Sequence, residues 1–174
     1  TVDEGSTLIL LANNLRAYQE ISKLITLGRR RGLKGSYSLF LEDLGVLQES
    51  LVILKATALE IDKRNLCWFK DKFKNRFWLG FGNFYEASDQ DLLNKLCVAA
   101  DNFNIPITAI GDVRMHTYSR RFLLDTVTAI RLKTKVDAIG NRKFNNAERY
   151  LRPLSRLKVL YAREMLAETI KIAD

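Results

Sequence analysis

The sequence predicts an α/β fold in which mainly parallel strands alternate with crossover helices. Short, almost continuous apolar runs recur along the chain, as is typical of strands covered on both faces. Longer segments with apolar residues at helical spacing separate them, which indicates a doubly wound sheet or part of a barrel. The strands are predicted at Thr7–Ala12, Leu51–Leu54, Arg76–Leu79 and Pro106–Ile110.

Length and composition indicate one globular domain. The chain has 174 residues, of which 47% are hydrophobic and 28% charged, so it can bury a core and is not a disordered chain. No apolar run approaches the roughly 20 residues that cross a bilayer, and the TVDEGS start is acidic where a signal peptide is basic, so we expect a cytoplasmic protein. The net charge of +8 favours an anionic partner such as nucleic acid.

The first predicted helix follows the first strand. Asn13 and Asn14 can cap its start. Arg29, Arg30 and Arg31 lie where positive charge complements a helix C-terminus. We interpret these arginines as a solvated helix end, with phosphate or interdomain contact as the alternative.

Two more helices connect the later strands. Ser88 followed by Asp91 resembles a capping box at the start of the second of them. An aromatic cluster near the first could stack on bases, although its spacing favours core packing: Trp68, Phe69, Phe73, Phe77 and Trp78.

The two cysteines, Cys67 and Cys97, show no CxxC spacing. This argues against a disulfide framework or a zinc knuckle. We predict two buried free thiols.

The segment after the fourth strand is the candidate site, because ligands of parallel α/β sheets bind beyond the carboxyl ends of the strands. Asp112, Arg114 and His116, the one histidine of the chain, lie there. The next helix has apolar residues at i, i+4 and i+7 that we predict to be core: Leu123, Val127 and Ile130.

The pattern then changes to a long polar loop and two amphipathic helices. We predict one domain over residues 1–174, with βα units in 1–132 and a loop plus helical extension in 133–174. The last helix reaches Asp174 without a tail, as expected of a segment from a longer chain.

Three stretches, in order over nearly the whole chain, resemble the bacterial C-family DNA polymerases. The first contains LLANNLRAY, LIT and GRRR within residues 10–31. The second and most specific, PITAIGDVRMHTYSRRFLLDTVTAIRL at 106–132, is similar to a segment of the error-prone branch. The third is NAERYLR at 146–152 with LAET at 166–169. The chain is identified as part of an error-prone relative of the polymerase III alpha subunit.

The resemblance implies the later part of a PHP (polymerase and histidinol phosphatase) domain, a distorted β/α barrel, here partial and ending in two C-terminal helices. Earlier strands and a histidine-rich metal motif would precede Thr1. The palm with the catalytic aspartates would follow Asp174.

An intact site of this family holds metal ions through histidines and carboxylates, which lower the pKa of a bridging water. Its last motif reads Asp-x-His, whereas this chain has Asp112-Val113-Arg114. A guanidinium has no lone pair to donate, and its charge opposes a cation. We therefore interpret Asp112, Arg114 and His116 as vestigial metal-motif positions, with Asp112 paired to Arg114 or another cation and no catalytic or metal-binding residue in this chain.

The other polar residues of this segment have plainer interpretations. His116 is expected to make local hydrogen bonds rather than to ligate. Arg120 and Arg121 begin a helix, where the dipole disfavours cations. They are expected to form salt bridges, for example to another polymerase domain, or to contact phosphate.

The leading hypothesis is a non-catalytic scaffold that supports the other domains of a lesion-bypass polymerase in DNA repair and replication. The parent would be a nucleotidyltransferase that uses Mg²⁺, with no cofactor in this segment. The alternatives are a metal-dependent PHP phosphoesterase and a basic DNA-binding module. Expected partners are the remaining polymerase domains, DNA through the parent and other replication or repair proteins, but no membrane. An exposed sheet edge predicts self-association.

Overall fold

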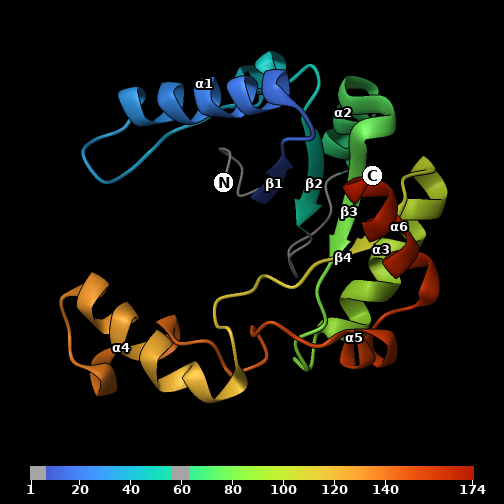
Figure 1. The fold of residues 1–174 in the computed structure, drawn as a ribbon. Coiled ribbons are helices and arrows are strands. Elements are labelled where there is room, and N and C mark those ends of the chain that lie inside the picture. Colours follow the sequence, from blue (N-terminus) through green and yellow to red (C-terminus); the bar gives the residue numbers. More distant parts are fainter. Residues whose placement is uncertain (1–6, 56–62) are drawn as a thin grey trace.

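The computed structural model describes residues 7–55 and 63–174, and within these ranges four strands form one sheet. Their order across the sheet is their order along the chain (Figure 1): β1 (Thr7–Leu11), β2 (Leu51–Lys55), β3 (Phe77–Phe81) and β4 (Ile107–Ala109). The mixed α/β class and the four predicted strands are confirmed. The TVDEGS start, on which the signal-peptide argument rested, lies outside the described residues.

Strand direction differs from the prediction at one edge of the sheet. β1 runs antiparallel to β2, with Leu11 opposite Leu51. The expectation of parallel pairing is therefore wrong for this pair, whereas β2, β3 and β4 are parallel as predicted.

The antiparallel pair arises because the connection between β1 and β2 folds back on itself. Helix α1 (Leu15–Arg31) leaves the sheet, and the following segment returns alongside it before the 3₁₀-helix η1 (Leu41–Val46). The backbone N–H of Ser38 donates to the carbonyl of Gly28 at 3.1 Å, and a Cβ on Gly28 would lie 3.0 Å from the Leu39 side chain. Glycine permits this close approach, so β2 starts beside the end of β1.

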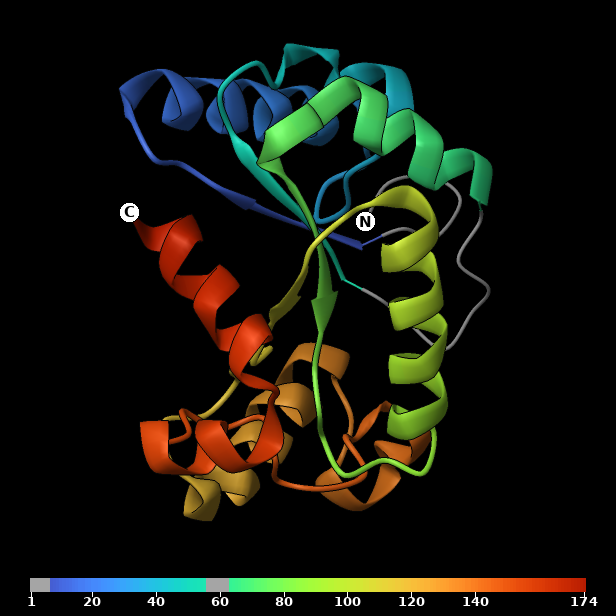
Figure 2. The ribbon, with the colours of Figure 1, turned by 90° about the vertical axis from the view of Figure 1, so that its right-hand side faces the viewer.

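The parallel strands are joined by true crossovers. α2 (Lys63–Phe73), continued by η2 (Lys74–Arg76), joins β2 to β3, and α3 (Asp89–Phe103) joins β3 to β4 (Figure 2). The carboxyl ends of three strands consequently meet at one edge of the sheet. In the part of the chain that the structure describes, no helix combines the length and apolar character needed to cross a membrane.

The main core lies on the face of the sheet covered by α2 and α3. Phe69, Phe73 and Phe77 are at most 2% exposed, and their rings stack with centroids 5.4 to 6.4 Å apart. This confirms core packing rather than an exposed base-stacking surface for these rings.

A smaller cluster occupies the opposite face of the sheet. Ile53 of β2, Trp78 of β3 and Ile110, the residue after β4, form this cluster and are at most 7% exposed. The last helix, α6 (Arg163–Ala173), contacts β4 and adds Ile172 to this cluster. The indole N–H of Trp78 donates to Glu168 of α6 at 2.9 Å, which fixes the helix on the sheet.

Two local predictions fail and one holds. Asn14 caps α1, since its side-chain oxygen accepts from the N–H of Ala17 at 2.8 Å. Ser88 makes no side-chain capping bond, because its backbone is already helical (φ −84°, ψ −7°) rather than extended as at a typical N-cap. Both cysteines, Cys67 and Cys97, are exposed rather than buried, because they lie on the outer sides of α2 and α3.

Helix α4 (Arg121–Leu132) also differs from the prediction. Leu123, Val127 and Ile130 are 51%, 54% and 71% exposed, so the expectation that they are core residues is wrong. The helix lies apart from the sheet (Figure 1). The side of α4 that carries Arg121, and not the side with these three residues, faces the loop after the helix. The loop after α4 contains short 3₁₀ turns, η4 (Val136–Ala138) and η5 (Gly140–Arg142). The two predicted C-terminal helices are confirmed as α5 (Leu154–Leu160) and α6.

A buried carboxylate on α1 fixes the start of β2. Glu20, 6% exposed, accepts the backbone N–H groups of Glu49 and Ser50 and the hydroxyl of Ser50 at 2.8 to 3.1 Å. Burial alone would raise the pKa of Glu20, but these hydrogen bonds lower it overall.

We expect Glu20→Gln to lower the free energy of unfolding by about 2 kcal/mol at pH 7, because an uncharged amide offers one acceptor oxygen to three donors. The folded-state pKa of Glu20 lies below its unfolded value, so the contribution is present above the unfolded pKa and disappears as pH falls through the folded one. Urea unfolding of wild type and variant should therefore converge in acid. Exposed Glu42→Gln is the matched control, and an equal loss there would contradict the assignment.

Candidate functional site

Asp112 lies directly beyond β4, at the edge where the parallel strands end. Its backbone φ is +39°, a left-handed conformation that aspartate tolerates better than most residues. The chain turns here, and the carboxylate, 13% exposed, points into the edge rather than away from it.

Three cations among the described residues contact this carboxylate. Lys55 Nζ lies 2.7 Å from Oδ2, and Arg149 Nε lies 3.3 Å from the same oxygen. Arg114 Nη2 lies 2.8 Å from Oδ1. The predicted pairing of Asp112 with Arg114 is confirmed, and two further partners join it. We refer to Lys55, Asp112, Arg114 and Arg149 as the edge cluster.

The electrostatics of the edge cluster favour an ionised Asp112. Burial of the carboxyl group by itself raises its pKa. The hydrogen bond and positive charge of Lys55, the charge of Arg114 and the hydrogen bond from Arg149 outweigh this effect, so that the pKa of Asp112 is lowered.

Arg149 is the most deeply held member of the edge cluster. Its guanidinium lies 4.0 Å from the ring centroid of Phe84 and 4.3 Å from that of Phe144, and it contacts Glu86 at 3.3 Å. Its backbone carbonyl accepts the N–H of Arg114 at 2.7 Å. Arg149 therefore joins the loops after β3 and β4 to the segment that leads to α5.

Sequence reasoning missed Lys55 and Arg149 for different reasons. Lys55 ends β2, and parallel strands place their carboxyl ends together, so its position could have been deduced from the predicted sheet. Arg149 lies in an irregular segment 37 residues after Asp112, where neither periodicity nor spacing indicates a contact.

The remaining predicted residues of this segment lie apart from the edge cluster. His116 and Arg120 are exposed. Arg121 turns inward: its Nε lies 3.0 Å from Asp125, and its guanidinium donates to the carbonyls of Phe144 and Asn146. Arg121 therefore pairs within the chain and fixes α4.

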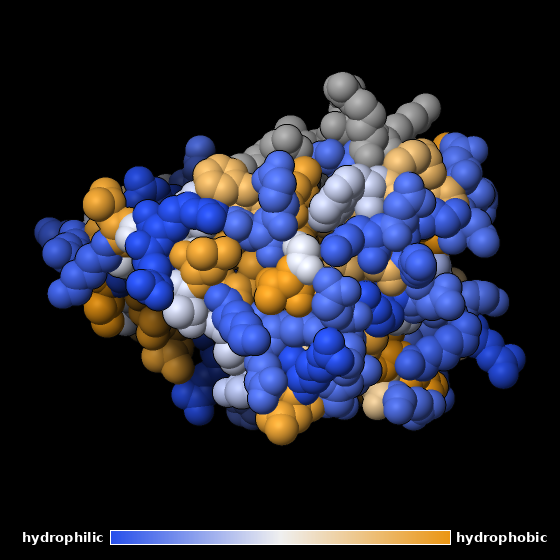
Figure 3. All heavy atoms as spheres, turned by 90° about the horizontal axis from the view of Figure 1, so that it is seen from above, coloured by the Kyte–Doolittle hydropathy of each residue, from blue (hydrophilic) through white to orange (hydrophobic). Residues whose placement is uncertain are grey.

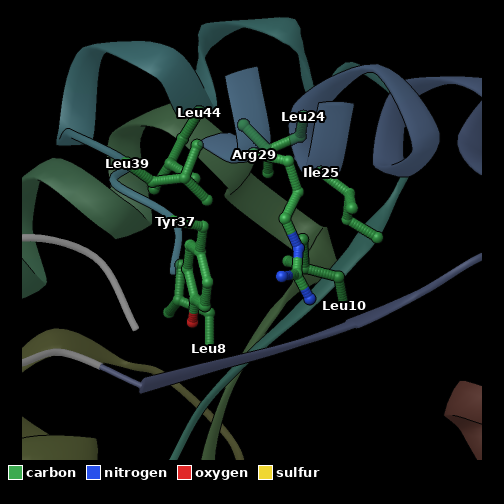
Figure 4. A pocket seen from close by; sticks show the side chains of 8 residues that line it. All are labelled: Leu8, Leu10, Leu24, Ile25, Arg29, Tyr37, Leu39 and Leu44. Atoms are coloured by element: carbon green, nitrogen blue, oxygen red, sulfur yellow. The ribbon is translucent and has the colours of Figure 1, made fainter. Parts of the chain in front are cut away.

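The three arginines at the end of α1 separate from one another. Arg31 pairs with Asp43 at 2.5 Å and lies over the ring of Phe40. Arg30 is exposed. On the face of the molecule seen from above, polar side chains predominate, with apolar ones between them (Figure 3). Arg29 points into a pocket between α1 and β1 (Figure 4). Arg29, Arg30 and Arg31 are therefore not part of the edge cluster.

The pocket beside β1 is predominantly apolar and has a volume of about 320 Å³. Its charged lining residue is Arg29, so it does not present the convergent polar groups typical of a catalytic site. Its walls come from β1, α1 and the return segment: Leu8, Leu10, Leu24, Ile25, Arg29, Tyr37, Leu39 and Leu44.

The edge cluster does not fit a metal ion. A metal site needs several lone-pair donors with negative or neutral charge, whereas Asp112 is surrounded by one ammonium and two guanidinium groups. Within residues 7–55 and 63–174, no group of three or more His, Cys, Asp or Glu side chains is placed to hold one.

The sequence of the chain is similar to segments of known proteins. No protein-family model matches the chain. It is 41% identical over 175 residues to "Error-prone DNA polymerase" of Pseudomonas aeruginosa, 39% over 176 residues to that of Pseudomonas syringae pv. tomato, and 38% over 178 residues to that of Dechloromonas aromatica. Each alignment covers 99% of this chain. The chain is homologous to a segment of error-prone DNA polymerases.

The chain spans 17% of the length of these error-prone polymerases. Most of each relative therefore lies outside the region described above. The edge cluster, α4 and the sheet all lie within the part of the chain that aligns with these relatives.

We expect Asp112→Asn to lower the free energy of unfolding by about 2 kcal/mol at pH 7, because three cations lose their shared counter-charge. Asparagine keeps the side-chain shape and tolerates the positive φ, so the variant isolates the charge. Arg114→Gln should cost less than about 1 kcal/mol, since the Arg114 side chain is 52% exposed. Thermal unfolding with exposed Asp71→Asn as control measures both. Equal losses for Asp112→Asn and Asp71→Asn would contradict the anchoring role.

Proposed function

We propose that this chain is the later part of the PHP domain of an error-prone DNA polymerase and supports DNA synthesis without catalysing a reaction of its own. The homology supports membership of a polymerase. The parallel strands, with a polar cluster beyond their carboxyl ends, are compatible with part of a PHP-type barrel.

One observation carries the non-catalytic assignment: the carboxylate of Asp112 is neutralised by Lys55, Arg114 and Arg149. In a metal-dependent phosphoesterase, a carboxylate at such an edge would hold a cation that activates water. Here protein cations contact both of its oxygens. Their fixed charges hold the loops together as a bound metal would, but they cannot activate a water molecule for hydrolysis.

The parent protein would perform template-directed nucleotidyl transfer with Mg²⁺ and deoxynucleoside triphosphates on carboxylates outside this chain. The contribution of this segment is structural support. A domain whose loops are tied by half-buried ion pairs offers neighbouring polymerase domains a fixed surface.

We expect the purified chain to contain no stoichiometric Zn²⁺ or Mn²⁺, and neither EDTA nor added metal to shift its melting temperature. Arg114→His restores the Asp-x-His pattern, but Lys55 and Arg149 keep their charge, so this variant should also stay metal-free. Elemental analysis and a phosphodiester hydrolysis assay measure both expectations. Stoichiometric metal that disappears in Asp112→Asn, together with turnover, would establish the phosphoesterase instead.

The supporting role is tested in a chimera in which this chain replaces the matched segment of the Pseudomonas aeruginosa polymerase. We expect Asp112→Asn to make primer extension more sensitive to heat while leaving its rate at 25 °C unchanged, because the variant loosens the segment and not the reacting groups. A slower rate without loss of heat stability would contradict this role. A steep salt dependence of single-stranded DNA binding by the isolated chain would favour the DNA-binding module.

A further inference from the structure

Helix α4 presents to solvent an apolar side that no described residue covers. Phe122, Leu123, Val127 and Ile130 are 74%, 51%, 54% and 71% exposed. At about 100° per residue, these positions fall within an arc of about 140° on one side of the helix. We call these four residues the α4 apolar face. Thr126 lies within the same arc, and its hydroxyl donates to the backbone carbonyl of Phe122 at 2.9 Å.

The opposite side of α4 holds the helix in this orientation through polar contacts. Arg121 pairs with Asp125 within the helix and donates to the carbonyls of Phe144 and Asn146. A surface helix of a globular protein normally turns its apolar stripe inward. Rotating α4 to do so would break the contacts of Arg121, so the apolar face is fixed outward.

Such a face has the composition of an interface. Large apolar residues gathered on one exposed element mark interaction sites, whereas scattered ones do not. Arg120, Arg131 and Lys133 are exposed beside the α4 apolar face and form a charged rim. An apolar centre with a polar rim is typical of protein–protein interfaces.

We propose that the α4 apolar face docks onto the part of the polymerase polypeptide that lies outside the segment matched by this chain. This inference rests on the proposed function. The matched segment is 17% of each relative, so most of the polypeptide is available as a covalently linked partner. Linkage gives that partner a high effective concentration, whereas a second copy of the chain must be met by diffusion.

The experiment compares the isolated chain with the Pseudomonas aeruginosa chimera by thiol labelling, read by peptide mass spectrometry. Phe122→Cys reports on the α4 apolar face, and Leu33→Cys, at a position 87% exposed, is the control. Both should label fast in the isolated chain. In the chimera we expect labelling at position 122 to slow roughly tenfold or more, with position 33 unchanged. Cys67 and Cys97 are exposed and give separate peptides.

Equal labelling rates in the chimera and the isolated chain would overturn the proposal, as would the same slowing at position 33. Protection of position 122 already in the isolated chain, together with a dimer by ultracentrifugation, would assign the face to a second copy and overturn it as well. These results leave the metal analysis and the Asp112→Asn effect untouched, so failure here is distinguishable from failure of the proposed function.

A second variant guards against a chimera that folds poorly. Phe122→Ser with Ile130→Ser should leave the melting temperature of the isolated chain unchanged or higher, because both side chains are already exposed. In the chimera the same change should speed heat inactivation. Hydrogen exchange of the aligned helix in the unmodified Pseudomonas aeruginosa polymerase should also be slower than that of α4 here, and equally fast exchange would contradict the docking.

Discussion

The carboxylate of Asp112 is the point on which this structure depends. It gathers Lys55 from the end of β2, Arg114 from the turn after β4 and Arg149 from the segment before α5. Lys55, Arg114 and Arg149 come from three separate segments of the chain. The largely buried carboxylate of Asp112 therefore holds these three segments together. Arg149 lies over the rings of Phe84 and Phe144, which hold the cation in place. Burial raises the pKa of Asp112, but its cationic partners lower it overall.

Polar contacts of an arginine also fix the irregular region that follows the sheet. α4 buries Ala129 and is held by Arg121, which pairs with Asp125 and donates to backbone carbonyls of the loop after the helix. Polar anchoring on the inner side leaves the apolar side free. The chain thus combines a charged edge with an exposed apolar surface, and interfaces between domains use both features.

The sequence predicts what depends on local pattern and fails where distant contacts decide. Strand positions and the buried Phe69 followed from spacing. The antiparallel β1 did not, because it depends on the close approach of the return segment to Gly28. The periodicity of α4 correctly indicated an apolar side containing Ile130, but periodicity does not say whether the same chain covers it. Lys55 was deducible from the parallel sheet, whereas Arg149 carried no such signal.

We propose that Lys55, Arg114 and Arg149 occupy the position beside Asp112 that a bound metal ion would need. A crystal structure of the chain grown with excess Zn²⁺ or Mn²⁺, with anomalous data at the metal edge, tests it most directly. We expect Lys55 Nζ to remain in contact with the carboxylate, with no anomalous peak beside it. A peak about 2.0 to 2.2 Å from a carboxylate oxygen of Asp112, with Lys55 displaced, would contradict it.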